Sequence, residues 1–291
     1  MIQMPSPAAV AHSRDEEPRR HYRTVFLSDT HLGAKRCRAR ELLSFLQRTS
    51  CDTLYLVGDI IDGWKLRRRW YWPELHAQVL NELLERARKG TRVIYVPGNH
   101  DAVFRTYDGL VLGELSVEHE TIHETADGRR MLVQHGDAFD GFVADSRWLG
   151  AVGDHAYEFS LFLNDAYNGV RKAFGRPYWS LSLFLKQRVK EAVGFLSRFE
   201  ERVAEDALQR GVDGVICGHV HKAEMRDIGG VLYCNDGDWV ESCTALVERA
   251  DGSLQLVQWQ EGQAVPIDGT QRYTAPAPEL EPQAGPELVG V

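Results

Sequence analysis

The chain has 291 residues, of which 43% are hydrophobic and 26% are charged, and its formal net charge is −8. This length suits one α/β domain with a large core, and no apolar run approaches the roughly 18 residues of a membrane span, which argues against an integral membrane protein. The acidic balance argues against nucleic acid as a partner, because nucleic-acid-binding domains normally carry a basic surface. The N-terminus lacks the features of a secretory signal, so we expect a cytoplasmic protein.

The two ends of the chain differ in composition from the middle. Residues 1–21 are polar and contain Pro, and residues 263–291 are rich in Pro, Gly and Glu. We therefore expect two disordered tails around a domain that spans 22–262. The chain has five cysteines, an odd number without the close spacing of a zinc or redox motif, so we expect reduced thiols.

Within the domain, short runs of β-branched and aromatic residues alternate with helical patterns. One helix is expected at about 73–89, where apolar residues share one face between Pro73 and Gly90. The alternation ends in strand-rich sequence and predicts a layered α/β sandwich. The runs expected to form strands are 23–29, 53–59, 92–99, 130–136, 214–221, 231–238, 244–249 and 254–260.

Residues 139–200 interrupt this alternation with a long, mainly helical insertion. The insertion holds 13 of the chain's 28 aromatic residues in 62 positions, which is about twice the average density for this chain. We interpret it as a lid that covers an apolar part of a ligand. The alternative is an amphipathic helical pair whose aromatic side chains pack on the core.

Five clusters of polar residues share one position in the pattern, the carboxyl end of an apolar run. In an open α/β sheet these ends line one edge, where ligands bind, so five loops are expected to converge on one crevice. Singly, such Asp and His residues are usually turn, capping or packing residues, but five clusters together favour a functional site. The clusters are Asp29-Thr30-His31, Gly58-Asp59-Ile60-Ile61-Asp62, Gly98-Asn99-His100-Asp101, His135-Gly136-Asp137 and Gly218-His219-Val220-His221.

These clusters combine carboxylate, imidazole and amide groups. Such a donor set suits divalent Mn, Fe or Zn better than a closed structural zinc site, which would favour thiolates. The candidate ligands also exceed what one ion needs. We therefore expect two ions that share a carboxylate, an arrangement suited to in-line attack at phosphorus.

The order of the clusters resembles the calcineurin-like metallophosphoesterase superfamily over roughly 23–225. The resemblance implies an α-β-β-α sandwich and a two-metal hydrolase, with Mn²⁺ as the expected metal and Fe or Zn as alternatives. By motif, it assigns Asp29, His31 and His221 to the first ion, Asn99, His135 and His219 to the second, and Asp59 to a bridge between them. His100 would stay unligated beside the substrate phosphate, where an imidazole stabilises developing charge or protonates the leaving oxygen.

Three further carboxylates lie in the same motifs. Asp101 is expected to orient a neighbouring group, and Asp62 and Asp137 are expected to support ligands or form turns rather than bind metal. Asn99 and His100 are also expected to contact substrate, since both follow the same strand into the crevice.

Within the superfamily, the stretches 28–33 and 57–64 and the helical insertion after Asp137 are similar to the UDP-2,3-diacylglucosamine hydrolase group of lipid A biosynthesis. This resemblance implies cleavage of the pyrophosphate bond of UDP-2,3-diacylglucosamine to give UMP and 2,3-diacylglucosamine 1-phosphate. Typical hydrolases of the group carry Arg after the Gly-Asn pair, whereas this chain has His100 at that position.

Two basic and aromatic stretches are candidates for contact with substrate and membrane. Trp179, Ser182, Lys186 and Lys190 are spaced to share one helical stripe, which would meet the anionic part of the substrate or else face solvent. Residues 65–72 mix Lys and Arg with Trp and Tyr. This mixture suggests transient docking on anionic lipid at the cytoplasmic face of the inner membrane, or else an ordinary exposed loop.

Two other functions fit the same residues. One is a phosphodiesterase or phosphatase acting on another phospholipid, a glycerophosphodiester or a nucleotide. The other is a non-catalytic scaffold on the same fold, which the complete set of ligands disfavours. The sequence leaves the oligomeric state open.

Overall fold

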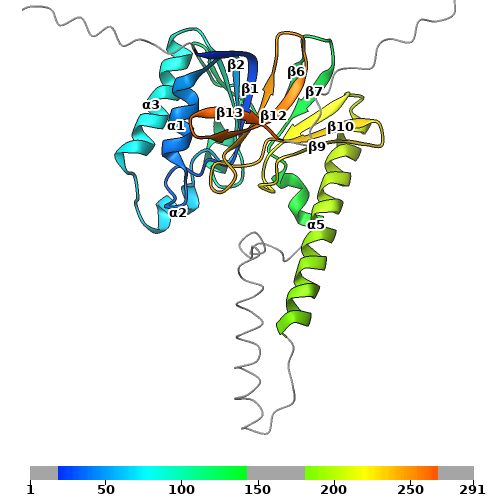
Figure 1. The fold of residues 1–291 in the computed structure, drawn as a ribbon. Helices are drawn as coiled ribbons and strands as arrows, with labels where there is room; N and C mark the ends of the chain where they lie inside the picture. Colours follow the sequence, from blue (N-terminus) through cyan, green and yellow to red (C-terminus); the bar gives the residue numbers. More distant parts are fainter. Residues whose placement is uncertain (1–18, 143–180, 268–291) are drawn as a thin grey trace, which may run out of the picture.

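The computed structural model describes residues 19–142 and 181–267, with side chains over 19–139 and 196–267. Two β-sheets face each other at its centre (Figure 1). The larger sheet has eight strands in the order β13-β12-β11-β1-β2-β3-β5-β4, and the smaller has five in the order β6-β7-β8-β10-β9. Neighbouring strands β1, β2, β3 and β5 run parallel, as do β7, β8 and β10.

The strands of the larger sheet are β1 (Arg20–Leu27), β2 (Thr49–Val57), β3 (Arg92–Val96), β4 (Val111–Leu112), β5 (Leu115–Val117), β11 (Thr244–Glu248), β12 (Leu254–Gln260) and β13 (Gln263–Pro266). Those of the smaller sheet are β6 (Thr121–Glu124), β7 (Arg130–Val133), β8 (Gly214–Cys217), β9 (Glu224–Ile228) and β10 (Val231–Asn235). All eight predicted strand runs overlap a strand of the structure, although β1 and β2 begin three and four residues earlier than predicted.

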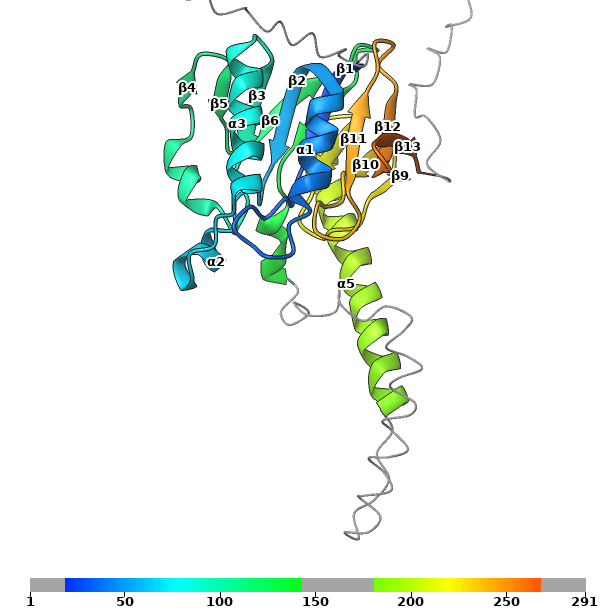
Figure 2. The same cartoon turned by 60° about the vertical axis from the view of Figure 1, so that its left-hand side comes forward.

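Helices cover the two outer faces of this pair of sheets. Helices α1 (Ala39–Arg48) and α3 (Glu74–Arg88) lie side by side on the larger sheet, and α5 (Leu181–Gln209) meets the smaller one through β8 and β10 (Figures 1 and 2). Shorter helical segments are α2 (Gly63–Arg68), η1 (Ala102–Tyr107) and η2 (Asp137–Phe142). The α-β-β-α sandwich expected from the resemblance is therefore confirmed, and α3 coincides with the predicted helix at 73–89.

Three apolar layers hold these elements together. The layer between the sheets buries Phe26, Val57, Ile94 and Ile216 completely, which explains why these central strands read as continuous apolar runs. A second layer joins α1 and α3 to the larger sheet, and a third joins α5 to the smaller one. Because both sheets are buried on both faces, the edge formed by their strand ends is the place left for polar chemistry.

Two predicted boundaries differ from the structure. The C-terminal tail was expected from 263, but Gln263–Pro266 form β13, which pairs with β12 at the edge of the larger sheet. The insertion was expected to end at 200, but α5 continues unbroken to Gln209. Phe199, Val203 and Ala207 of this helix are buried against the smaller sheet, so its C-terminal part belongs to the core. In Figure 1 its N-terminal part runs away from the sheets.

Among the described residues, no helix combines the length and apolar character needed to cross a membrane.

Candidate active site

Five loops converge at the carboxyl edge of the two sheets, as the motif pattern predicts. They follow β1, β2 and β3 of the larger sheet and β7 and β8 of the smaller one. Backbone hydrogen bonds tie the loops together: Asp29 N donates to Gly58 O at 3.0 Å, and His31 N donates to Asp59 O at 2.9 Å. Gly218 N donates to His135 O at 3.2 Å in the smaller sheet. The ligand candidates are thus mounted on hydrogen-bonded strand ends rather than on long mobile loops.

The backbone of this edge is unusual. Among the described residues, seven non-glycine positions have a left-handed φ, and five of them are predicted metal ligands. A left-handed φ is uncommon outside glycine, and it concentrates where the surrounding structure fixes a functional geometry. These five are Asp29, His31, Asp59, His219 and His221, with φ between 49° and 70°.

Two glycines of the motifs are required by close packing of these loops. A Cβ on Gly58, whose φ is +84°, would collide with the imidazole of His135. A Cβ on Gly98 would collide with the carboxylate of Asp59. The glycines therefore let backbone pass directly beside ligand side chains, which explains why glycine stands at these two positions.

The first group of ligand candidates consists of Asp29, His31 and His221. Asp29 Oδ1 lies 3.1 Å from His221 Nε2 and 3.7 Å from His31 Nε2, and the two imidazole Nε2 atoms are 3.4 Å apart. Three ligand atoms from the loops after β1 and β8 thus face one point.

The second group lies across the shared carboxylate of Asp59. Asp59 Oδ1 is 3.5 Å from His135 Nε2, whereas Asp59 Oδ2 is 3.9 Å from His31 Nε2. One carboxylate therefore presents one oxygen to each side of the site. The Nδ1 of His135 lies 2.8 Å from Val57 O, a contact that places the proton on Nδ1 and leaves Nε2 as the coordinating nitrogen. His219 stacks edge-on against His135 at 5.2 Å between ring centroids.

The side chains fit the metal ions that the motifs imply. Three atoms at the centre of the site are buried and have no hydrogen-bond partner in the described part of the chain: Asp29 Oδ1, Asn99 Oδ1 and His135 Nε2. Buried polar atoms are normally paired, so these unpaired atoms among the ligand candidates are available to a cation. Carboxylate, imidazole and amide donors are the set that Mn, Fe or Zn accepts.

The electrostatics of the metal-free site point the same way. Burial opposes charge on both imidazoles, but the carboxylates of Asp29 and Asp59 outweigh it and raise the pKa of His31 and of His135 to about 10. Burial also opposes charge on Asp29, which would raise the pKa of this carboxyl group. The imidazoles of His221 and His31 outweigh burial and hold the pKa of Asp29 well below its usual range. Without a cation, protons on these imidazoles would balance the carboxylates.

His100 is fixed on three sides at the rim of the site. Its Nδ1 lies 3.1 Å from Asp62 Oδ1, and its Nε2 is 3.8 Å from Asp59 Oδ2. The indole of Trp64 stacks on the imidazole with 4.0 Å between ring centroids and 29° between planes. Although burial would raise the pKa of Asp62, its contacts with His100 and His31 lower it below its usual range. Asp62 thus holds a negative charge beside His100.

The other two carboxylates, Asp101 and Asp137, make hydrogen bonds between loops. Asp101 is buried and accepts from Gly98 N at 2.6 Å, Ile60 N at 2.7 Å and the Tyr95 hydroxyl at 2.5 Å. It therefore links the second and third motif loops. Asp137 accepts from Arg105 Nη2 at 2.6 Å, which ties the start of η2 to η1.

Some residues fall outside this description or were not anticipated. Trp179 and the side chains of Ser182, Lys186 and Lys190 lie outside the described residues. Trp64 was not singled out, although it follows Asp62 by two positions. Asp236 was also not singled out, yet it is fully buried near Asp29 and accepts from Ser28 Oγ at 2.5 Å. A signal for Asp236 was present, because it ends an apolar run as the other clusters do.

Known proteins are similar to this chain in sequence. The calcineurin-like phosphoesterase family model matches residues 22–223. A UDP-2,3-diacylglucosamine hydrolase of Chromohalobacter salexigens is 24% identical over 226 residues, covering 70% of this chain and 82% of that protein. The DNA polymerase II small subunit of Archaeoglobus fulgidus is 24% identical over 258 residues, covering 77% of this chain; the match spans only 47% of that protein.

Two solved structures are similar at lower identity. YfcE, a phosphoesterase from E. coli, is 16% identical, with a TM-score of 0.43 over 84% of this chain and 97% of that chain. Vacuolar Protein Sorting 29 from Cryptosporidium parvum is 12% identical, with a TM-score of 0.40 over 84% of this chain and 94% of that chain. The family match covers most of the chain and extends just past His221, the last candidate ligand, so the chain belongs to the calcineurin-like phosphoesterase family and is a metal-dependent hydrolase.

Proposed function

We propose that this enzyme hydrolyses the pyrophosphate bond of UDP-2,3-diacylglucosamine, giving UMP and 2,3-diacylglucosamine 1-phosphate, a step of lipid A biosynthesis. The observation that carries the proposal is the match to a hydrolase of this name over 82% of that protein's length. It is supported by the ligand candidates grouped at one edge of the sheets. A pyrophosphate is a phosphoanhydride whose cleavage suits a two-metal clamp.

The proposed ligand roles follow the order of the motifs. Asp29, His31 and His221 hold the first ion, and Asn99, His135 and His219 hold the second. Asp59 bridges the ions, a role supported by its two oxygens facing His31 and His135 on opposite sides. Mn²⁺ is the metal we propose, with Fe or Zn as alternatives that accept the same donors.

When bound, such ions polarise the phosphoryl group and lower the pKa of a coordinated water. The residues around them supply orientation and a proton. Asp62 accepts the Nδ1 proton of His100, which directs Nε2 toward the place where charge develops. From there His100 stabilises the phosphoryl oxygens or donates a proton to the leaving oxygen, and Asn99 contacts the same phosphate.

The lipid part of the proposal rests on the surface beside α2. Arg67, Arg68 and Arg69 are exposed, and Trp70 is 74% exposed next to them. A basic and aromatic surface of this kind suits transient contact with anionic lipid at the inner membrane. The insertion at 139–200 would cover the acyl chains, and Trp179, Ser182, Lys186 and Lys190 would contact the substrate.

A second candidate keeps the chemistry and changes the substrate. His100 stands where typical hydrolases of this group carry Arg, which favours a phosphodiesterase or phosphatase acting on another phospholipid, a glycerophosphodiester or a nucleotide. A non-catalytic scaffold would be expected to lack ligands, and this chain retains all seven.

One assay separates these functions. The purified protein, supplemented with Mn²⁺, is tested against UDP-2,3-diacylglucosamine, bis-p-nitrophenyl phosphate and p-nitrophenyl phosphate. We expect cleavage of the first two substrates without activity on the monoester. Activity on bis-p-nitrophenyl phosphate alone would support a different natural substrate, and no turnover of any substrate would support the scaffold.

A further inference from the structure

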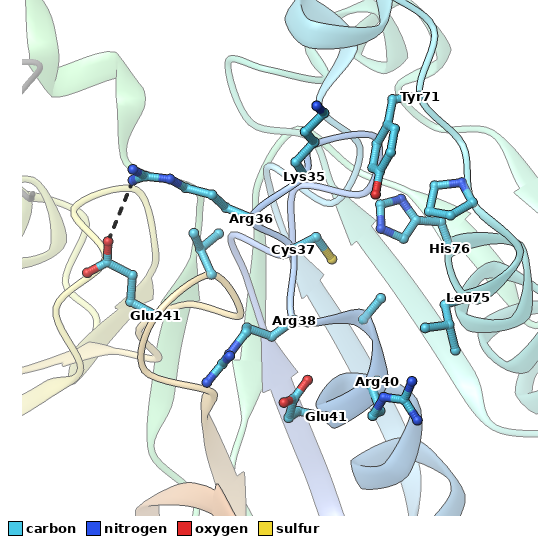
Figure 3. A pocket seen from close by; sticks show the side chains of 13 residues that line it. Lys35, Arg36, Cys37, Arg38, Arg40, Glu41, Tyr71, Leu75, His76 and Glu241 are labelled. Carbon is cyan, nitrogen blue, oxygen red and sulfur yellow. Dashed lines mark ion pairs between the residues drawn. The ribbon is translucent and has the colours of Figure 1, made fainter.

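A cleft of about 770 Å³ opens beside the metal-ligand loops (Figure 3). It lies between three segments: the loop that leads from His31 to α1, the approach to α3, and the loop after Trp239. None of its lining residues belongs to the ligand set or to His100. We call it the α1–α3 cleft.

The α1–α3 cleft is basic in an acidic protein. Its lining includes four cations, Lys35, Arg36, Arg38 and Arg40, against the two carboxylates of Glu41 and Glu241, whereas the whole chain has a net charge of −8. The ion pair from Arg36 to Glu241 is 3.9 Å long and exposed, so it neutralises little. Lys35 and Arg40 have no ion-pair partner within the described ranges. Local charge of this sign attracts an anion.

The opposite wall is uncharged and partly aromatic. Figure 3 places Tyr71, His76 and Leu75 along one side of the cleft, facing Arg38 and Cys37. Burial lowers the pKa of His76, and it raises the pKa of the Cys37 thiol to about 12, so both groups are neutral at pH 7. The edge of the His76 ring meets Tyr71 at 5.8 Å. A cationic rim with a flat neutral wall suits a ligand that joins a phosphate to an aromatic ring.

The cleft is tied to the metal site on two sides. Gly33 N donates to His76 Nδ1 at 2.9 Å, and Ala34 N turns back to His31 O at 2.9 Å. Four residues span at most about 14 Å, which bounds the distance from the backbone of His31 to that of Lys35. On the other side, the backbone N–H of Trp239 donates to Asp29 O at 3.1 Å, and Trp239 is next to the lining residue Val240.

We propose that the α1–α3 cleft binds the nucleoside phosphate half of the substrate, with the phosphate next to the reacting one at the cationic rim and the base against Tyr71. This inference rests on the proposed function, because a nucleotide-linked diphosphate supplies both parts. The metal site then holds the reacting phosphoryl group, and the cleft selects what is attached to it.

The experiment compares the Lys35→Ala/Arg40→Ala double variant and Tyr71→Ala with the matched control Arg88→Ala, whose side chain is exposed near the far end of α3. In the Mn²⁺-loaded enzyme, we expect KM for UDP-2,3-diacylglucosamine to rise at least about tenfold in the double variant, with kcat within about threefold. UMP inhibition should weaken in parallel, and Tyr71→Ala should weaken it by about three- to tenfold. Hydrolysis of bis-p-nitrophenyl phosphate, which carries no nucleoside, should stay within about twofold of wild type.

The outcomes separate this inference from the proposed function. An unchanged KM for UDP-2,3-diacylglucosamine in the double variant overturns the inference and leaves the proposed function intact. An equal loss of activity on UDP-2,3-diacylglucosamine and on bis-p-nitrophenyl phosphate has the same meaning. Inhibition by inorganic phosphate could also weaken in the double variant as much as inhibition by UMP does. In that case the cleft would bind any anion without recognising a nucleoside, and the inference would be overturned. If the wild type does not turn over UDP-2,3-diacylglucosamine, the proposed function fails. Calorimetric titration with UMP then decides: tenfold weaker binding in the double variant, but not in Arg88→Ala, supports the cleft, and equal binding rejects it.

Discussion

Two buried clusters of carboxylate and imidazole flank β1, one beyond its carboxyl end and one beside its middle. Beyond the carboxyl end, Asp29 is fully buried and its Oδ1 has no hydrogen-bond partner within the described residues. Beside the middle of the strand, Glu248 is equally buried, and both its oxygens are satisfied. Glu248 accepts from Arg23 Nη1 at 2.6 Å, Thr24 Oγ1 at 2.6 Å, Ala126 N at 2.8 Å and His123 Nε2 at 2.8 Å.

The two clusters contain the same kinds of side chain, but they differ in how completely their polar atoms are hydrogen-bonded. A carboxylate that accepts four hydrogen bonds has no capacity left for a ligand, and it stabilises the fold as it stands. Asp29 and its neighbours combine orphan acceptors with left-handed backbone, a cost that function has to explain. We therefore expect mutations in the Asp29 cluster to affect metal binding and turnover, and mutations in the Glu248 cluster to affect stability.

The largest effect is expected from Asp59→Ala. The substitution removes the carboxylate that faces both ligand groups, so turnover should fall by about 10³-fold or more, and fewer than two ions should remain per chain. Elemental analysis alongside the diester assay measures both. Two ions retained with normal turnover would remove Asp59 from the bridge.

His100→Ala should lower turnover by roughly 10²–10⁴-fold while both ions stay bound, because a positioned proton donor is lost but no proposed ligand is. Metal content is the informative readout, since His100 Nε2 lies only 3.8 Å from Asp59 Oδ2. A collapse of metal content would make His100 a ligand and contradict the proposed role.

Glu248→Ala tests the second cluster, beside the middle of β1. It leaves the buried His123 and Thr24 without their acceptor, so the free energy of unfolding should fall by about 3–5 kcal/mol. Denaturant unfolding measures this loss. The folded fraction should keep two ions and wild-type turnover, and a loss of metal in Glu248→Ala would mean that the two clusters are coupled through β1.

The pH dependence of metal binding follows from the raised pKa values of His31 and His135, both about 10 in the metal-free site. Each imidazole must lose its proton to coordinate, so metal affinity should rise by about tenfold or more per pH unit between pH 6 and 9. The metal-free protein behaves in the opposite way. The stability from the protonated imidazoles is complete below about pH 6.5 and is lost as the pH rises through about 10. Calorimetry at several pH values, with and without EDTA, checks both trends.

The sequence predicted the parts of this molecule that depend on local patterns. The central strands are long apolar runs, and α3 carries a clear apolar face between Pro73 and Gly90. The strands β4, β5, β6 and β9 were missed, because at most one residue of each is buried, so they lack the apolar runs that mark equally short strands such as β7 and β8. The strand β13 was missed because its pairing with β12 outweighs a polar, Pro-containing composition.

The candidate site was predicted from motif order, but its fine structure was not. Nothing in the spacing of Asp59 indicates that its two oxygens face opposite sides of the site. The stacking of Trp64 on His100 and the anchoring of Gly33 by His76 join separate loops. Such contacts depend on the packing of the folded chain rather than on local sequence.

The smallest effect concerns Trp64, which we expect to position His100. Its ring stacks on the imidazole at 4.0 Å while 40% of the residue remains exposed, so its loss should cost little stability. A stacking contact of this kind contributes about 0.5–1.5 kcal/mol, and Trp64→Ala should therefore lower kcat by about two- to tenfold without loss of metal. Trp64→Phe should restore most of the activity, because a flat ring again covers His100.

Trp70→Ala is the matched control for this prediction. Trp70 lies just after the end of α2 and is 74% exposed. Its ring lies 6.2 Å from that of Trp72, between centroids, rather than on His100. Its replacement should leave hydrolysis of bis-p-nitrophenyl phosphate unchanged. Rescue by the conservative variant separates positioning from packing: if Trp64 holds His100 against Asp62, Trp64→Phe should recover the kcat that Trp64→Ala loses. Equal losses in Trp64→Ala and Trp64→Phe would instead mean that the indole only packs the surface of α2.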